Sequence, residues 1–229
     1  MKRLRTAIAA CVLTAATAVG VIVQPTATAA TFPNGKDPVI FVHGYSRGTG
    51  DWDVMVARFR AAGYTDSQLV LFGYNSTTQS NVRTAELLGQ RVEQVLANTG
   101  ASKVDIVSHS MGSLNSRYCV KFTGCAGRVD DWISISGNNN GTNTARWCTY
   151  YVTCREMVPG SALLTKLNSG SALPAGVQGT VYWTRDDQII SPPTSSILPG
   201  LATVEVTGVT HLNIVKNDQV IAAVLASVA

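Results

Sequence analysis

Short apolar runs alternate along the chain with longer segments in which apolar residues recur every three or four positions. The apolar runs, typical of buried β-strands, fall at 38–42, 69–72, 103–107, 132–135, 180–183 and 202–206. The segments with helical spacing fall at 52–62, 81–97, 113–123, 162–167 and 214–226. This alternation predicts an α/β fold with about six mostly parallel strands and helices on both faces. In such sheets, functional residues gather at the carboxyl ends of the strands.

The first 30 residues have the features of a secretory signal peptide. Three basic residues open the chain, an apolar run extends to about Val23, and the small residues at 27–30 supply a cleavage site. An uncleaved membrane anchor is the alternative, but the many alanines and threonines make the run weakly apolar. We therefore expect residues 1–30 to be removed and residues 31–229 to form one secreted, extracellular domain, with monomer as the default state.

Loss of the leader changes the charge balance. Without its three basic residues the 18 Lys and Arg fall to 15, against 14 Asp and Glu, and the net charge falls from +4 to +1. The mature chain therefore gives no reason to expect a nucleic-acid partner.

Four cysteines remain in the mature chain: Cys119, Cys125, Cys148 and Cys154. An even number in an exported protein favours two disulfides. Three pairings are possible, and we favour the local one, in which each cysteine bonds its neighbour six positions away. The spacings do not fit a zinc site, so no metal is expected. The second pair lies within 137–160, a stretch without clear periodicity that we interpret as a stapled surface loop.

A candidate nucleophile lies where the strand at 103–107 gives way to the helix at 113–123. Ser110 stands there between Ser108 and Gly112, each two positions away. A serine between small residues at a strand-to-helix turn is a nucleophile elbow, usually written G-x-S-x-G. Small neighbours are needed because the strand and the helix pass each other closely at this turn. The pattern predicts that Ser110 is a nucleophile, with Ser108 in place of the first glycine.

A serine hydroxyl needs a base, which is usually a histidine, and the chain has only three. His109 is the immediate neighbour of Ser110 and is expected to point away from it. His43 follows the first strand. His211 lies late in the chain, as the order Ser, acid, His of α/β hydrolases requires. We therefore predict His211 as the base.

The base in turn needs a carboxylate to orient it. The candidates after Ser110 are Asp130, Asp131, Glu156, Asp186, Asp187, Glu205 and Asp218. The pair Asp186 and Asp187 follows the strand at 180–183, at the carboxyl end where this group belongs. Asp130 and Asp131 lie at the amino end of a strand, Glu205 lies within a strand, and Asp218 lies within the last helix. The residue pattern alone leaves the choice between Asp186 and Asp187 open.

Backbone N–H groups are also needed to stabilise the negative oxygen that forms during acyl transfer. One is expected from Met111, the residue after the nucleophile. A second is expected from Tyr45, because Gly44 lets the chain turn closely after the first strand.

Four of these segments together resemble the small secreted bacterial triacylglycerol lipases of the lipase A type, in the lipase class 2 family: 38–44, 103–112, 187–190 and 208–211. The resemblance implies a minimal α/β-hydrolase fold without a lid or cofactor. It also implies hydrolysis of carboxylic esters, including acylglycerols, by Ser110, His211 and Asp187, with Tyr45 and Met111 as oxyanion donors. An Asp-x-Ile-Ile/Val segment marks the acid in this family, which favours Asp187 over Asp186.

The chain departs from the family pattern at Ser108, at Ser113 and in the long stretch 137–160, which we expect to cover part of the acyl site. Apolar side chains expected around that site are Tyr45, Met111, Ile189 and Leu212. The expected partner is a small-molecule or lipid ester, with transient contact at a lipid surface. The alternatives are an acyltransferase or polyester depolymerase with the same three residues, and a secreted binding protein that has lost catalysis.

Overall fold

The computed structural model describes residue 32 and residues 34–228 of the 229-residue chain, so the expected signal peptide at 1–30 lies outside the described residues. The described chain forms one sheet of six strands. In chain order these are β1 (Val39–Val42), β2 (Leu69–Phe72), β3 (Val104–His109), β4 (Val129–Ile135), β5 (Gln178–Trp183) and β6 (Ala202–Glu205).

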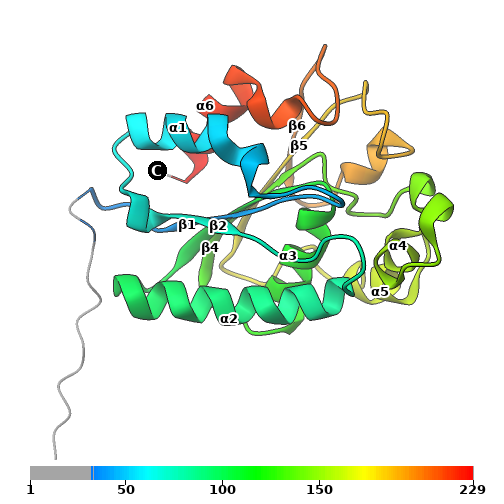
Figure 1. Ribbon diagram of the computed structural model, residues 1–229, viewed down its shortest axis with the longest axis horizontal. Helices are drawn as coiled ribbons and strands as arrows, with labels where there is room; N and C mark the ends of the chain where they lie inside the picture. Colours follow the sequence, from blue (N-terminus) through cyan, green and yellow to red (C-terminus); the bar gives the residue numbers. More distant parts are fainter. Residues whose placement is uncertain (1–31, 33, 229) are drawn as a thin grey trace, which may run out of the picture.

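All neighbouring strands of the sheet are parallel, in the order β2-β1-β3-β4-β5-β6. β3 lies inside the sheet, with Val107 paired to Phe41 of β1 on one side and to Ile133 of β4 on the other. Because every strand runs the same way, all the carboxyl ends open onto one edge, which is the right-hand edge in Figure 1. The loops after β1, β3, β5 and β6 therefore meet there.

Helices cover both faces of the sheet. They are α1 (Asp53–Ala61), α2 (Asn81–Thr99), α3 (Met111–Phe122), α4 (Val152–Met157), α5 (Ala162–Leu167) and α6 (Asp218–Ser227). Short 3₁₀ helices are η1 (Thr49–Trp52), η2 (Asp66–Gln68), η3 (Asn143–Cys148), η4 (Pro193–Ser196) and η5 (Ile214–Lys216). Figure 1 shows α1 and α6 on one face, α2 and α3 on the other, and α4 and α5 beside the carboxyl edge.

The core has two parts, one on each side of the sheet. Successive residues of β1 alternate between them: Ile40 and Val42 pack with α2 and α3, whereas Val39 and Phe41 pack with α1 and α6. This follows from the two-residue period of a strand. Because both faces are buried, the strand reads as a continuous apolar run rather than an alternating one, and this is the pattern from which the strand was predicted.

The predicted α/β fold is confirmed, with two differences in its elements. The stretch 137–160 is not simply a loop, because it contains η3 and α4. The predicted last helix is divided into η5 and α6 by Asn217. The side chain of Asn217 accepts hydrogen bonds from the backbone N–H groups of Gln219 and Val220, so it caps a new helix at this point.

The local disulfide pairing is also confirmed. Cys119 bonds Cys125 at the end of α3, and Cys148 bonds Cys154 between η3 and α4. None of the helices among residues 34–228 is both long enough and apolar enough to span a bilayer.

The amino end of the sheet holds a buried carboxyl group, that of Asp105 on β3. Its Oδ1 accepts a hydrogen bond from the backbone N–H of Asp131 at 3.1 Å. Burial raises the pKa of Asp105 to about 8, and the nearby charges of Asp131, Asp37 and Asp130 act in the same direction. Between about pH 4 and pH 8 the folded state keeps the proton of Asp105, whereas the unfolded state releases it. The free energy of unfolding therefore decreases as the pH rises through this range.

Asp105→Asn should therefore flatten the dependence of stability on pH. The amide keeps an acceptor for the Asp131 N–H but does not ionise. We expect the variant to be more stable than the wild type at pH 9 and the difference to shrink towards pH 5. The slope changes by at most about 1.4 kcal/mol per pH unit. Urea unfolding at four pH values measures this, and parallel curves for the two proteins would show that Asp105 is not protonated in the folded state.

Candidate active site

Ser110 occupies the sharp turn between β3 and α3. Its backbone has φ of 54° and ψ of −126°, a conformation that side-chain-bearing residues rarely adopt. Two hydrogen bonds hold the turn: the Ser110 N–H donates to the carbonyl of Ile135 at 3.0 Å, and the Ser113 N–H donates to the carbonyl of Ser110 at 3.0 Å. The turn therefore has the strained geometry of a nucleophile elbow.

The residues around Ser110 are small because backbones approach each other there. A Cβ on Gly112 would lie 2.3 Å from the carbonyl oxygen of Val42, and one on Gly44 would lie 2.9 Å from the Cβ of Ser110. Ser108 is fully buried, and its hydroxyl donates to the carbonyl of Ile133 at 2.7 Å. Serine is therefore accommodated where the G-x-S-x-G pattern has its first glycine, because its hydroxyl finds an acceptor on β4.

His211 and Asp187, from the loops after β6 and β5, meet through a direct hydrogen bond. The His211 Nδ1–H donates to Asp187 Oδ2 at 2.8 Å, and both side chains are buried. Because the carboxylate only accepts, this contact places the proton of a neutral imidazole on Nδ1. Nε2 of His211 is then left as the atom with a free lone pair.

The carboxylate of Asp187 is also held by its own loop. Oδ1 accepts hydrogen bonds from the backbone N–H groups of Ile189 at 2.9 Å and Ile190 at 2.7 Å. Burial raises the pKa of Asp187, but the hydrogen bond and charge of His211 and these two N–H donors outweigh burial and hold the pKa below its usual value. Asp187 is therefore ionised at neutral pH and oriented towards His211.

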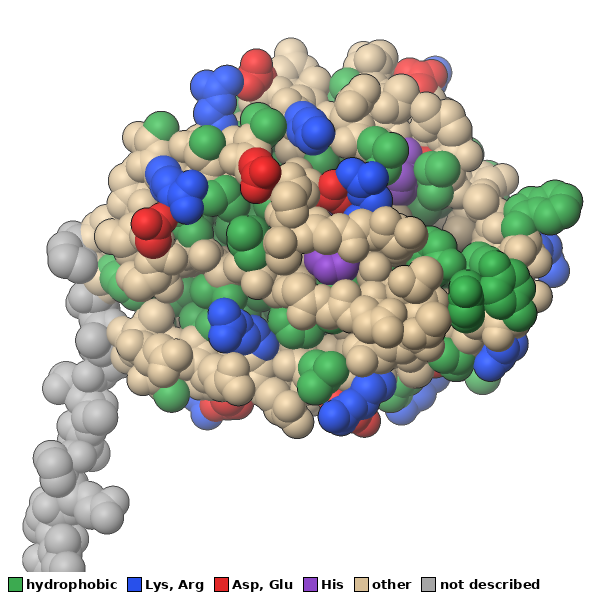
Figure 2. All heavy atoms as spheres, in the orientation of Figure 1, with side chains coloured by type: hydrophobic (Ala, Val, Ile, Leu, Met, Phe, Trp, Pro, Cys, Tyr) green, Lys and Arg blue, Asp and Glu red, His purple; other side chains and the backbone are tan. Residues whose placement is uncertain are grey.

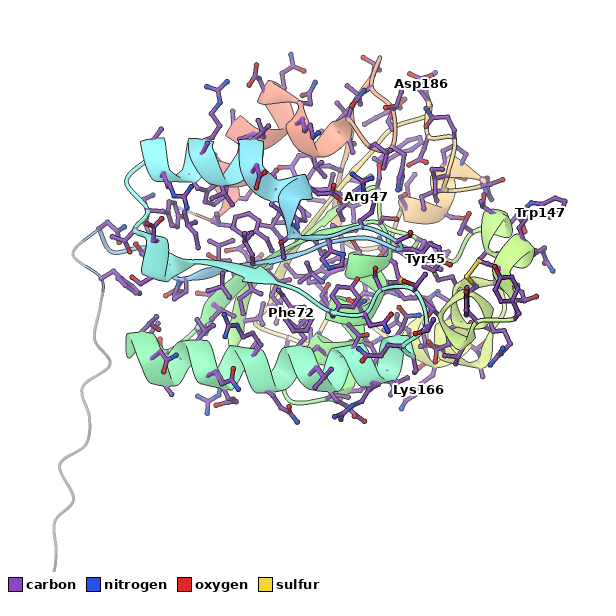
Figure 3. The ribbon with its side chains drawn as sticks, in the orientation of Figure 1. Tyr45, Arg47, Phe72, Trp147, Lys166 and Asp186 are labelled. Atoms are coloured by element: carbon purple, nitrogen blue, oxygen red, sulfur yellow. A yellow bond between two sulfur atoms is a disulfide. The ribbon has the colours of Figure 1, made fainter. Side chains whose placement is uncertain are left out.

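Asp186, the competing candidate, faces another way. It is exposed at the outer side of the loop, as Figure 3 shows, and accepts a hydrogen bond from the Gly208 N–H at 3.1 Å. The adjacent Arg185 pairs with Glu205 rather than with either aspartate. The geometry thus separates two neighbouring carboxylates that the residue pattern alone left equivalent.

Within the described residues, the hydrogen bonds do not include one between the Ser110 hydroxyl and His211. The turn at Ser110 and the loop of His211 are linked instead through His109. This side chain is buried, and its ring centroid lies 4.7 Å from that of His211. The Nε2–H of His109 donates to the backbone carbonyl of His211 at 2.9 Å. Catalytic hydrogen bonds are often long in unliganded proteins and shorten when substrate binds.

The role of His109 was missed by sequence reasoning, which expected its side chain only to point away from Ser110. Burial lowers the pKa of His109 to about 3, and the charge of His211 adds to this effect. His109 is therefore neutral at neutral pH. It acts as a fixed donor that holds the His211 backbone, and it is a positioning residue rather than a second base.

Two backbone N–H groups beside Ser110 have no acceptor in the described part of the chain, those of Tyr45 and Met111. Met111 is the first residue of α3, so its N–H has no partner within the helix. The loop that carries Tyr45 is held in place by Tyr74. The hydroxyl of Tyr74 donates to the carbonyl of His43 at 2.6 Å, and the rings of these two residues stack with centroids 4.3 Å apart.

Tyr74 is a second positioning residue without a signal in the sequence, because it belongs to a loop 31 residues from His43. Of the apolar residues expected around the acyl site, Met111 is buried, Tyr45 is half-buried, and Ile189 and Leu212 are exposed. Ile189 follows Asp187 by two positions and Leu212 follows His211 directly, so their exposed apolar surface adjoins the Asp187–His211 pair.

Gly112→Ala should destabilise the protein through a clash of backbone with Cβ. The carbonyl oxygen of Val42 is part of β1 and has little room to move, so we expect a loss of about 1–3 kcal/mol in the free energy of unfolding. The matched control is Gly48→Ala, where the added Cβ meets nothing within 4 Å. Denaturant unfolding compares the two variants, and equal stabilities would show that α3 does not cross β1 as closely as described.

Comparisons with known proteins point to one family. The family model described as lipase (class 2) matches residues 36–228. A triacylglycerol lipase of Burkholderia plantarii is 36% identical over 102 residues, and one of Pseudarthrobacter phenanthrenivorans is 35% identical over 94 residues. These matches cover 42% and 38% of this chain but only 28% and 29% of the relatives, so the matched segment spans less than a third of their length.

Solved structures share the fold at low sequence identity. The mature form of Bacillus licheniformis lipase BlEst2 superposes with a TM-score of 0.73 at 13% identity, over 85% of this chain and 92% of that one. Aspergillus fumigatus lipase B superposes with a TM-score of 0.69 at 20% identity, over 84% and 52% of the two chains. At these identities the likeness shows the fold alone. The family match over residues 36–228 shows that the chain belongs to the lipase (class 2) family.

Proposed function

We propose that this protein is a serine carboxylic ester hydrolase, with Ser110 as nucleophile, His211 as base and Asp187 as orienting acid. The observation that carries the proposal is the buried hydrogen bond between His211 Nδ1 and Asp187 Oδ2, together with the contact of His211 with His109, which directly precedes a serine in elbow conformation. Membership of the lipase (class 2) family and the two similar triacylglycerol lipases support this chemistry.

The reaction begins when the Ser110 hydroxyl approaches Nε2 of His211, whose lone pair is free because Nδ1–H is bound to Asp187. His211 takes the hydroxyl proton as the oxygen attacks the ester carbonyl, and the negative charge of Asp187 stabilises the imidazolium. The N–H groups of Tyr45 and Met111 donate to the carbonyl oxygen as it becomes negative. Each such donor typically contributes about 2.7–4 kcal/mol to the transition state.

The second half of the reaction releases the acid. His211 returns its proton to the departing alcohol, which leaves an acyl group on Ser110. Water, deprotonated by the same imidazole, then attacks the acyl carbonyl, and the Ser110 oxygen leaves with the proton held by His211. Bond changes are confined to the ester, water, Ser110 and His211, and the backbone N–H groups of Tyr45 and Met111 donate to the oxyanion in both halves of the reaction.

The proposed substrates are acylglycerols or related lipid esters. The exposed Ile189 and Leu212 beside the pair provide an apolar rim suited to an acyl chain. We further propose that residues 1–30 are a leader removed on secretion and that residues 31–229 act outside the cell as a single monomeric domain. The two disulfides support an oxidising compartment.

Hydrolysis of p-nitrophenyl esters from acetate to palmitate tests the proposal. Ser110→Ala should lose roughly 10⁶ in kcat because the nucleophile is gone, and Asp187→Ala roughly 10⁴ because the imidazole loses its orienting charge. The matched control is Asp186→Ala. The Asp186 side chain faces away from His211, so the kcat of this variant should stay within a few fold of wild type.

Turnover that persists in Ser110→Ala would contradict the assignment of the nucleophile. A larger loss in Asp186→Ala than in Asp187→Ala would contradict the assignment of the acid. A wild-type protein without turnover on any ester would favour the alternative of a binding protein.

A further inference from the structure

The two most exposed large hydrophobic side chains among the described residues lie close together in the sequence. Trp147 is 87% exposed and Tyr150 is 72% exposed, whereas the other exposed large hydrophobic residues are at most 45% exposed. Both belong to residues 146–151, which we call the stapled turn. Figure 3 shows Trp147 projecting from the right-hand edge of the molecule, and Figure 2 shows a patch of hydrophobic side chains there in the same orientation.

The stapled turn is held in shape by covalent and hydrogen bonds. The disulfide between Cys148 and Cys154 ties it to α4, and the Tyr151 N–H donates to the carbonyl of Cys148 at 2.9 Å. From α4, Nη1 of Arg155 donates to the carbonyls of Thr149 at 2.9 Å and of Tyr150 at 3.2 Å. The aromatic side chains are thus presented on a fixed backbone, so less conformational entropy is lost when they bind.

Positive charge surrounds these aromatic side chains. Arg146 and Arg155 are exposed, and neither makes a salt bridge within the described residues. The neighbouring carboxylate, Glu156, is directed elsewhere: it accepts hydrogen bonds from the Ser80 hydroxyl and from the backbone N–H of Asn81. The exposed surface of the turn and the adjoining α4 therefore combines a tryptophan and a tyrosine with two cationic side chains that make no salt bridge.

Two residues that precede the stapled turn, Thr142 and Asn143, are hydrogen-bonded to the loop that carries Asp187. The Thr142 hydroxyl donates to the carbonyl of Ile189 at 2.8 Å and accepts from the Ser191 N–H at 2.9 Å. The N–H of Asn143, the first residue of η3, donates to the carbonyl of Ser191 at 2.8 Å. The turn thus has a fixed position relative to Ile189, which belongs to the apolar rim.

We propose that the stapled turn is the anchor by which this protein docks on an anionic lipid surface, with Trp147 and Tyr150 entering the interface and Arg146 and Arg155 facing lipid phosphates. Tryptophan and tyrosine are the side chains most suited to the boundary between headgroups and acyl chains. Basic residues near an anionic surface add about 1 kcal/mol each, or about fivefold in affinity. The inference rests on the proposed function, because docking there brings the apolar rim towards lipid esters.

This role differs from the cover over the acyl site that the sequence suggested for residues 137–160. An anchor needs its aromatic side chains exposed and its backbone fixed, and both conditions are met. A cover would instead bury Trp147 and Tyr150 against the site, which the observed exposures do not show.

Vesicle binding by Ser110→Ala tests the proposal without hydrolysis and independently of the proposed reaction. The vesicles are phosphatidylcholine alone or phosphatidylcholine with 30% phosphatidylglycerol, a composition chosen for the experiment. Binding is measured by co-sedimentation and by the emission of Trp147. The other three tryptophans are buried or half-buried, so a blue shift reports the environment of Trp147.

We expect tighter binding to the anionic vesicles, a blue shift on binding, and weakening by salt. In the same background, Trp147→Ala should lower the affinity at least tenfold, and Arg146→Gln about fivefold on anionic vesicles only. The matched control is Phe122→Ala, which removes an exposed aromatic side chain beside Lys121 and Lys166 at the end of α3. This control should bind like its parent.

Three results would overturn the proposal: no binding to either vesicle, binding unaffected by Trp147→Ala, or an equal loss in the Phe122→Ala control. Thermal unfolding of each variant shows that a loss of binding is not a loss of folding. If wild type hydrolyses soluble esters but Ser110→Ala does not bind vesicles, the anchor is wrong and the reaction stands. If Ser110→Ala binds vesicles while wild type hydrolyses no ester, the reaction is wrong and the anchor stands.

Discussion

The close crossing of α3 over the end of β1 is the constraint on which the site depends. A Cβ at Gly112 would lie only 2.3 Å from the carbonyl oxygen of Val42, so a glycine is required for the helix to start where it does. At that start Ser110 has a positive φ, and the Met111 N–H has no partner among the described residues. One close contact therefore accompanies both the backbone conformation of Ser110 and the free N–H that we propose as an oxyanion donor.

Polar groups from four loops are held against this turn by hydrogen bonds between distant parts of the chain. Tyr74 fixes the loop of Tyr45, His109 fixes the backbone of His211, and two N–H groups fix the carboxylate of Asp187. Burial keeps His109 neutral, whereas hydrogen bonds keep Asp187 ionised in a similarly buried place. The different charge states of these two buried groups follow from their partners, because burial alone disfavours the charged form of both.

The parts of this arrangement that could be predicted from sequence are those encoded locally. β1 and β3 were predicted because both of their faces are buried, and the elbow was predicted because its spacing of small residues is short. The choice between Asp186 and Asp187 required the loop conformation that turns only one carboxylate towards His211. His109 and Tyr74 had no local signal, since each acts on a carbonyl group far away in the sequence. The residues of η3 and α4 show no apolar period, whereas α5, which is equally short, has Leu163, Leu164 and Leu167 on its buried face.

The most direct test of the central claim is covalent labelling by a fluorophosphonate, followed by mass mapping of the modified peptide. The serine oxygen attacks phosphorus and fluoride leaves, so the reaction requires an activated hydroxyl but no ester substrate. The described geometry predicts a single adduct, on Ser110, and a much slower reaction in Asp187→Ala than in Asp186→Ala. An adduct on another serine, or none in folded wild-type protein, would contradict the claim that the elbow, His211 and Asp187 form one catalytic unit.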